Sequence, residues 1–492
     1  MSRHGTERSL PRSRAMPLMM MCIVCLFVVY IYVLNSSIAA MKDGSDVYRT
    51  ISQDQWIYQV ERYKDFSSIR RGIIVCVFDA MIPMAASLVL ELRALGNTEL
   101  IQMYHCNGEL SAASYRILYM IDAHLEIVDV CKDFVASGRL STSKVSDFRS
   151  FWLKPLALVH TRLVEVILLD ADDLLFHDPS QLWQVPGYKK TGTIFFFDRE
   201  VAKAEYLNSR SIHRFQRMQN LHALIETFDY ARFGLVKQPS EYLQSTLAWN
   251  GHSAHEQDSS IVVINKAIAP LAIDVLLHLV LVTRYQLEFS YGDKELFWLA
   301  FELAHVPYSF SPWANTAAAM PGDMAQHPDT ICGGLAQWMP LADAKSVLLH
   351  INGGYIFNPY IDHDVHSMQD AAGRTHQLLA AIPSHVSRQR KRSKPLTTPE
   401  DKANPDGYWP QECLYKRGSE AMRPQDVASI QRRVHSAVRI ASLHQRELAL
   451  DKKSDTARRQ RRLGNADNGA QEDTTFGSCT WSANCNSPRA AS

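Results

Sequence analysis

The chain has 492 residues, of which 46% are hydrophobic, and its formal net charge at pH 7 is +1. This length exceeds what one small core needs, so we expect one large domain with appended segments. A charge so close to zero gives no overall field that would attract nucleic acid, and no nucleic-acid partner is expected.

The first apolar segment, residues 16–34, contains no charged side chain. As a helix it would be about 28 Å long, close to the roughly 30 Å hydrocarbon core of a bilayer. Arginines precede it, so residues 1–15 are expected in the cytosol and the rest of the chain across the membrane. A cleaved signal peptide is the alternative, because small residues follow near Ala39, but the apolar core is long for one. We expect a single-pass type II membrane protein with a stem over residues 35–68.

Residues 69–384 alternate between patterns typical of strands and helices, which predicts an α/β domain with parallel βαβ units. A helix over 146–161 is expected to be interrupted by Pro155. The other helices are predicted over 84–96, 266–285 and 293–305. The strands are predicted over 71–80, 99–106, 125–130, 165–169, 192–198, 259–266 and 345–353.

Residues 385–492 differ in composition from the domain before them. They begin with a basic run over 388–394, which is typical of a solvated linker or a processing site. An isolated polar helix is possible over 424–452, and the last forty or so residues have the composition of a disordered segment. We assign no chemistry to this tail.

Acidic residues follow the apolar run 165–169 directly: Asp170, Asp172 and Asp173. Acids at the carboxyl end of such a strand lie where open α/β sheets bind their ligands. Strand alternation predicts that Asp170 and Asp172 point the same way. Two carboxylates on one side suit Mn²⁺ or Mg²⁺, which complete their coordination with diphosphate oxygens and water. A sugar-nucleotide glycosyltransferase is therefore the leading hypothesis, because the metal neutralises charge on a diphosphate leaving group.

Two other interpretations of this D-x-D motif remain open. Phosphatases of the haloacid dehalogenase type also place D-x-D after a strand, but on the first strand and with Thr or Val where this chain has Leu174. Alternatively, the acids cap a turn and a helix and have no role in chemistry.

The stretch from 151 to 198, which contains "VEVILLDADDLLFHDPSQLW", resembles the fungal-type Golgi α-1,3-mannosyltransferase family. The similarity extends to 91–110, 256–266 and 291–312 and covers roughly residues 70–360. The resemblance implies a GT-A fold, which is a Rossmann-like nucleotide-sugar-binding domain. It also implies a GDP-mannose donor, Mn²⁺, retention of anomeric configuration, a glycan acceptor in protein glycosylation, and residence in the Golgi membrane.

Candidate site residues follow from this resemblance. Asp170 and Asp172 match the family's metal-binding acids, and Asp170 is also assigned to the nucleotide sugar. Lys154 matches a lysine that could pair with the diphosphate, although a helix lysine is often simply solvated. His350 ends a predicted strand where GT-A enzymes often supply a third metal ligand, or it is a structural histidine.

Three further acids are candidates for binding the transferred sugar or stabilising its anomeric cation: Asp258, Asp293 and Glu295. Asp258 could instead be a turn residue, and the other two could be acids at a helix start.

The chain departs from the family pattern in two places. Ser259-Ser260 replaces a typical Ser-Gly, which is expected to reshape the sugar pocket. Asp79 stands where a glycine is typical, which is expected to affect recognition of the base. These departures leave two alternatives open, a transferase with a UDP-sugar donor and a non-catalytic scaffold that binds sugar nucleotides or glycans.

Overall fold

The computed structural model describes residues 68–213, 215–319, 324, 331–341, 346–354, 356–357, 371–393, 412–414 and 418–468. The predicted cytosolic tail, the membrane anchor over 16–34 and nearly all of the stem lie outside these residues. Within the part of the chain that is described, no helix is both long and apolar enough to cross a membrane.

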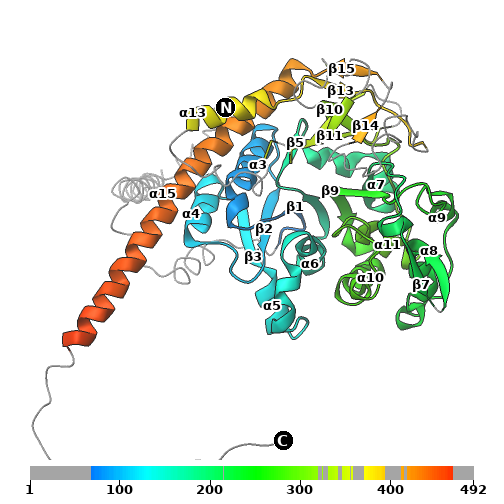
Figure 1. Ribbon diagram of the computed structural model, residues 1–492, viewed down its shortest axis with the longest axis horizontal. Coiled ribbons are helices and arrows are strands. Elements are labelled where there is room, and N and C mark those ends of the chain that lie inside the picture. Colours follow the sequence, from blue (N-terminus) through cyan, green and yellow to red (C-terminus); the bar gives the residue numbers. More distant parts are fainter. Residues whose placement is uncertain are drawn as a thin grey trace, which may run out of the picture. The chain divides into compact units, whose positions relative to one another are not determined.

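The first sheet has six strands and both parallel and antiparallel neighbours (Figure 1). Its first four strands are parallel, as the βαβ pattern predicts, whereas the last two pair in antiparallel fashion. In spatial order the strands are β3 (Leu125–Asp129), β2 (Leu100–His105), β1 (Arg71–Cys76), β4 (Glu165–Leu169), β9 (Gln257–Asn265) and β6 (Thr193–Phe197).

Helices cover this sheet on both sides. Figure 1 shows α3 and α4 on one side, next to α15, with α6 and α10 on the other. Ile74, Leu168 and Val262 face α6, α10 and α11 in one buried apolar cluster, as alternation along a strand requires. The helices of the described sheet layers are α3 (Ile82–Ala94), α4 (Ala112–Ile121), α5 (Val130–Ala136), α6 (Leu153–His160), α10 (Pro270–Leu281) and α11 (Leu296–Leu303).

Pro155 does not interrupt a long helix, contrary to expectation. It lies in the first turn of α6, which begins at Leu153. A proline is tolerated there because the first N–H groups of a helix have no partner within it. Short 3-10 turns over 142–148 and 150–152 precede the helix.

The second sheet is antiparallel and includes segments from distant parts of the chain. The chain enters it directly after β4, because β4 ends at Leu169 and β5 begins at Asp173. Its strands are, in spatial order, β15 (Ser419–Ala421), β13 (His385–Ser387), β10 (Thr316–Ala319), β11 (Ile331–Trp338), β12 (Leu348–Asn352) and β5 (Asp173–Leu175), with β14 (Glu412–Leu414) beside β11.

The expected domain end at residue 384 needs correction, because the following strands belong to the second sheet. The polar helix expected over 424–452 is also not isolated. It is part of α15 (Pro424–Asn468), which packs against α3 and α4 (Figure 1). Its buried side chains recur at helical spacing, which gives the helix an apolar stripe: Ile430, Val434, Ala437 and Ala441. Ion pairs such as Arg116–Glu447, at 2.8 Å, flank this contact.

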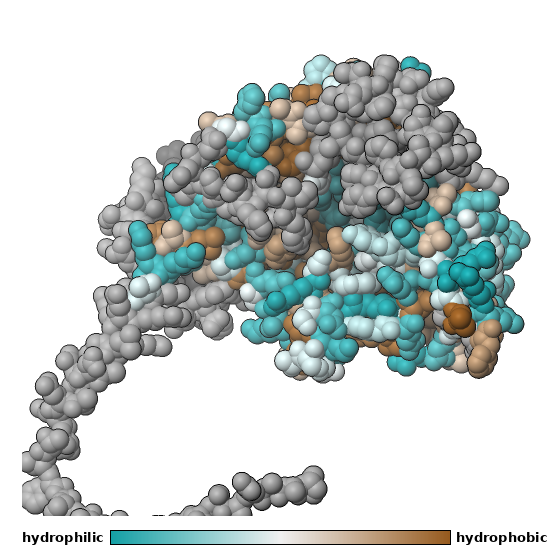
Figure 2. Space-filling model, in the orientation of Figure 1, coloured by the Kyte–Doolittle hydropathy of each residue, from teal (hydrophilic) through white to brown (hydrophobic). Residues whose placement is uncertain are grey.

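The described surface is mainly hydrophilic in the view of Figure 2, with hydrophobic residues in limited areas. A disulfide joins Cys106, after β2, to Cys131 on α5. It ties the edge of the sheet to the helix that covers it.

Candidate active site

Acidic side chains from several strands meet at one edge of the first sheet. β1 and β4 end at this edge, and β6, which runs parallel to them, also ends there. β9 runs the other way and therefore begins there. The topology thus places Asp79, Asp170, Asp198 and Asp258 around the carboxyl ends of the parallel strands, as predicted for a ligand site.

The D-x-D motif forms a turn between the two sheets and does not continue β4. The N–H of Asp173 donates to the carbonyl of Asp170 at 3.2 Å, and the N–H of Asp170 donates to the carbonyl of Ser260 at 2.9 Å. From the second sheet, the N–H of Gly353 donates to the carbonyl of Asp172 at 3.0 Å. Strand alternation therefore does not apply to Asp170 and Asp172, and backbone hydrogen bonds from both sheets set their positions.

Lys154 lies between two of the predicted site acids. Its Nζ is 2.6 Å from Asp170 Oδ1 and 3.4 Å from Asp293 Oδ2, and it donates to the carbonyl of Ser259 at 3.2 Å. Burial would lower the pKa of Lys154, but the two carboxylates outweigh it and raise that pKa above its usual value. The ammonium therefore stays charged, and it is committed to Asp170 and Asp293.

Carboxylates outnumber cations around this turn in the described residues. Burial, reinforced by neighbouring acids, raises the pKa of Asp170 to about 7 and raises the pKa values of Asp172 and Asp173. A side chain in place of Gly354 would bring its Cβ within 3.0 Å of Asp172 Oδ2, so the space beside this carboxylate depends on a glycine. Hard oxygen ligands with uncompensated negative charge fit a divalent cation.

His350 does not join Asp170 and Asp172 in a three-ligand set. It lies on β12, is fully buried, and its Nε2 is 3.0 Å from Ser260 Oγ and 3.7 Å from Asp173 Oδ1. Burial lowers its pKa to about 4, so the ring is neutral at pH 7. Among the described residues, no group of three or more His, Cys, Asp or Glu side chains is arranged to hold a metal ion. The observed contacts of His350 link the two sheets.

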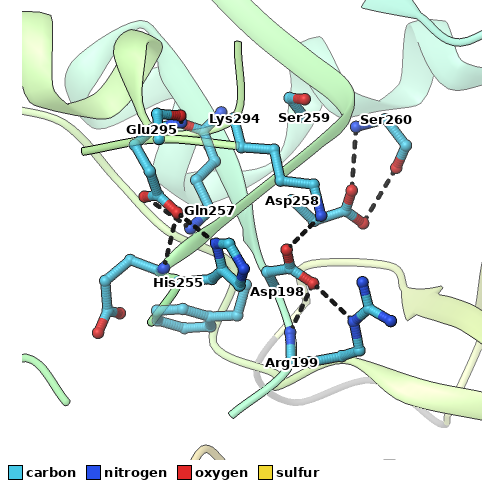
Figure 3. A network of polar contacts seen from close by, with 12 residues as sticks. Asp198, Arg199, His255, Gln257, Asp258, Ser259, Ser260, Lys294 and Glu295 are labelled. Atoms are coloured by element: carbon cyan, nitrogen blue, oxygen red, sulfur yellow. Dashed lines mark hydrogen bonds and ion pairs between the residues drawn. The ribbon is translucent and has the colours of Figure 1, made fainter. Parts of the chain in front are cut away.

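Asp258 has protein partners on both of its carboxylate oxygens (Figure 3). Its Oδ1 accepts from the N–H of Ser260 at 3.0 Å, and its Oδ2 accepts from Ser260 Oγ at 3.0 Å and Gln337 Nε2 at 2.9 Å. These bonds fit the turn-residue alternative. They also explain the departure at Ser260, whose hydroxyl lies between Asp258 and His350.

Glu295 is also occupied by structural contacts (Figure 3). It is fully buried and accepts from the backbone N–H groups of Glu256 and Gln257 and from Trp298 Nε1 at 2.7 Å. Glu295 therefore links the start of β9 to α11 through hydrogen bonds. Asp293 is different, because its buried Oδ2 forms an ion pair with Lys154 Nζ at 3.4 Å. Of the three acids predicted for the sugar, Asp293 alone lies beside Lys154.

Asp79 follows β1 at the predicted edge and contacts α4. Its Oδ1 accepts from the N–H of Ser111 at 2.7 Å and from Ser114 Oγ at 2.5 Å. Ser114 Oγ also lies 3.0 Å from Nε2 of His444 on α15. The residue that replaces a typical glycine thus fixes the start of α4 and connects it to α15.

Arg433 is a site residue that the sequence did not reveal. This arginine of α15 is 1% exposed and donates to the carbonyl of Ala171, the middle residue of the D-x-D turn. Burial lowers its pKa to about 10, against the raising effect of Asp173 and Asp172, so it is charged at pH 7. No sequence signal distinguishes it from the neighbouring Arg432, which is exposed.

The basic run 388–394 is expected to be solvated, but two of its arginines, Arg390 and Arg392, are paired with buried acids. Arg390 NH1 donates to Glu200 Oε1 at 3.0 Å, and Arg392 NH2 is 3.1 Å from Glu256 Oε2. Nearby, Asp198 is fully buried and lies 2.6 Å from Lys294 Nζ (Figure 3). These ion pairs fix the positions of Glu200, Glu256 and Asp198 beside the site.

A comparison with models of known protein families identifies the family of this chain. A family model described as "Mannosyltransferase putative" matches residues 70–339, which is more than half of the chain. The chain belongs to this mannosyltransferase family. The matched range contains the whole first sheet and every predicted site residue except His350.

Two curated relatives from Saccharomyces cerevisiae are named as α-1,3-mannosyltransferases. MNN1 is 25% identical over 58% of this chain and 41% of its own length, and MNT2 is 23% identical over 61% of this chain and 54% of its own length. The chain thus spans about half the length of these relatives. Among solved structures, the mannosyltransferase Ktr4p from S. cerevisiae matches 51% of this chain and 76% of its own, with 9% identity and a TM-score of 0.33.

Proposed function

We propose that this protein is a retaining, metal-dependent glycosyltransferase of the GT-A type that moves mannose from GDP-mannose to a mannose-containing glycan. The observation that carries the proposal is the D-x-D turn, where the partly buried Asp170 and Asp172 and the buried Asp173 stand together at the ligand-binding edge of the sheet. Membership of a mannosyltransferase family supports the choice of sugar.

Asp170 and Asp172 would hold a Mn²⁺ or Mg²⁺ ion, whose positive charge would stabilise the diphosphate leaving group. Lys154 fixes the Asp170 carboxylate, and Arg433 fixes the backbone of the turn at Ala171. Asp293 pairs with Lys154 at 3.4 Å and so fixes this lysine beside Asp170, and of the three predicted acids it is the one that we place near the donor sugar. The observed contacts of His350, Asp258 and Glu295 support positioning roles for these residues.

The transfer itself needs few groups from the protein. The bond from the anomeric carbon to the diphosphate oxygen breaks, and its electron pair stays on the diphosphate. The acceptor hydroxyl oxygen bonds to the same face of the anomeric carbon, and its proton passes to the diphosphate. Such a mechanism depends on preorganised electrostatics and requires no strong general base.

The same proposal includes a Golgi location with the domain in the lumen. The apolar segment 16–34 and the arginines before it support a type II anchor. The Cys106–Cys131 disulfide also supports an oxidising compartment, because disulfides seldom persist in the cytosol.

The substitution Asp172→Asn tests the function. We expect it to abolish Mn²⁺-dependent transfer from GDP-mannose to α-mannobiose, while the thermal unfolding temperature without metal stays within a few degrees. Asp133→Asn is the matched control, because this aspartate on α5 has a side chain that is 55% exposed. Unchanged turnover in Asp172→Asn would reject the assignment.

Two further measurements separate the alternatives. A donor screen with GDP-mannose and UDP-sugars identifies the nucleotide, and activity with a UDP-sugar alone would overturn the proposed donor. Calorimetry with GDP, UDP and Mn²⁺ identifies a scaffold, which would bind one of them without transferring or hydrolysing a donor.

A further inference from the structure

A cleft rich in aromatic side chains is lined by residues that neighbour Lys154 and Asp293 in the sequence. Its volume is about 560 Å³ including the open mouth, and Trp152, Tyr206 and Tyr291 contribute aromatic rings to its lining. Polar groups accompany them, notably Arg284 and Glu288. This combination of apolar rings and a few polar groups is typical of sites for small organic ligands.

The cleft and the candidate active site share two chain segments. Trp152 lies two residues before Lys154, at the start of α6, and Tyr291 lies two residues before Asp293. Lys154 Nζ is 3.4 Å from Asp293 Oδ2, so the two segments meet at the candidate active site. The aromatic residues Trp152 and Tyr291 lie two residues earlier on each segment, on the side of the cleft. Gly292, the residue before Asp293, lines the cleft, so a ligand there would lie beside the segment that carries Asp293.

The backbone at the cleft has a positive φ at two positions, Tyr206 and Gly292. Tyr206 has a φ of +44°, which is rare for a residue with a side chain. Gly292 has a φ of +62°, and a Cβ on it would lie 2.9 Å from the Cβ of Phe151. The ring of Tyr206 meets that of Tyr291 edge to face, at 5.5 Å between centroids.

The exposure of these rings needs an explanation. Phe151 and Tyr291 contact each other at 5.9 Å between centroids, and each is 48% exposed. Burying such rings would favour folding, so chains that leave them open at a cleft commonly use them for binding.

The cleft has little free positive charge for an anionic ligand. The guanidinium of Arg284 stacks over Trp152, with Cζ 4.2 Å from the ring centroid, and donates to the carbonyl of Asp147 at 3.1 Å. A second cleft shares Tyr206 and Glu288 with the first and adds polar side chains, including Ser209 and Gln286. Together they suit a neutral, extended ligand with apolar ring faces and many hydroxyl groups.

We infer that the aromatic cleft is the acceptor subsite, where the terminal pyranose of a neutral oligosaccharide packs its C–H face against Tyr291 and Trp152. This inference rests on the proposed function, since it places the attacking hydroxyl at the end of the cleft where Gly292 precedes Asp293. The second cleft takes the following sugars of the same chain.

Steady-state kinetics with the full-length chain test the inference. In Tyr291→Ala we expect the KM for α-mannobiose to rise at least tenfold, while the KM for GDP-mannose and donor hydrolysis without acceptor change less than twofold. Tyr291→Phe keeps the ring and should stay within threefold of the wild type. Phe215→Ala is the control, because it removes a wholly exposed ring that does not line either cleft. A KM for the acceptor that is unchanged in Tyr291→Ala, or a donor KM that rises equally, overturns the inference.

Binding without turnover separates this inference from the proposed function. Titration of the protein with α-mannotetraose, followed by calorimetry, should show binding that Tyr291→Ala weakens at least tenfold. Such binding in a protein that transfers no sugar would support the cleft and reject the transferase. If the protein transfers sugar but its oligosaccharide binding is unchanged in Tyr291→Ala, the transferase is supported and the cleft is rejected as the acceptor subsite. A second substitution, Trp152→Phe, should weaken binding severalfold and covers the case in which Tyr291→Ala does not fold.

Discussion

Among single residues, Lys154 is the cation that pairs with both Asp170 and Asp293. In Lys154→Met we expect the free energy of unfolding to fall by about 3 kcal/mol, because the buried Asp293 and the partly buried Asp170 then lack their shared cation. Urea unfolding at pH 7 measures this change. Adding Asp293→Asn to the variant should recover part of the loss, since it removes one of the unpaired charges. A single variant as stable as the wild type would show that the ammonium is not needed there.

Asp198 offers a test of pH dependence at the same scale. Burial would raise the pKa of this carboxyl, but Lys294 and Arg199 outweigh burial and hold the pKa well below its usual value. As the pH falls, the unfolded chain therefore takes up the proton first. The stability that Asp198 contributes is complete above about pH 4 and is lost as the pH falls below it.

The substitution Lys294→Met should remove most of this contribution. We expect a clear loss in the free energy of unfolding at pH 7 and a smaller difference from the wild type below about pH 4, because protonation removes the buried charge that the variant leaves unpaired. Urea unfolding at a series of pH values provides the measurement. A difference that stays constant from pH 7 to pH 3 would contradict the pairing.

At the level of elements, the strands of the first sheet could be predicted because their signals are local. The apolar runs at 71–80, 99–106, 125–130 and 165–169 contain β1 to β4, and 259–266 overlaps β9. The switch between sheets at the D-x-D turn could not be predicted. β4 and β5 are separated by three residues, and only pairing with β12, more than 170 residues later, reveals that they belong to different sheets.

The roles of side chains could likewise be predicted where the signal is local, but not where the partners lie on distant elements. The position of Asp170 follows from the end of its own strand, so sequence placed it at the site. His350, Asp258 and Glu295 have partners on other elements, such as Ser260 for His350 and Gln337 for Asp258. Sequence could place these side chains near the edge but could not identify the hydrogen bonds that occupy them.

Helix α15 shows how a distant element can set the geometry of the site, through Arg433 and Ala171. In Arg433→Met we expect kcat to fall at least tenfold, with the KM for the acceptor within twofold, because the turn loses a hydrogen-bond donor and the nearby acids lose a cation. The Mn²⁺ concentration for half-maximal activity should shift as well. The control is Arg439→Met, which changes an exposed arginine on the same helix. Equal activity in both variants would exclude a positioning role for Arg433.

At the scale of the whole molecule, residues after 384 complete the domain that carries the candidate site. They supply three strands of the second sheet, the partners of Glu200 and Glu256, and the helix that covers α3. Compositional contrast suggested a detached tail because these segments are polar and basic. Ion pairs with buried acids and a narrow apolar stripe are hard to detect in a sequence, although both hold segments together in the folded protein.

Truncation therefore gives a test that distinguishes an integral part of the domain from a tail. A chain that ends at residue 384 should lose cooperative unfolding and bind a hydrophobic dye, because it exposes the apolar face of α3 and leaves Glu200 and Glu256 buried without Arg390 and Arg392. A chain that ends at residue 468 keeps every described contact and should unfold within a few degrees of the full chain. In the full-length protein, the double substitution Arg390→Ala and Arg392→Ala should lower the unfolding temperature through the same buried acids. If the chain ending at 384 unfolds cooperatively at the wild-type temperature, the residues after it are dispensable for the fold.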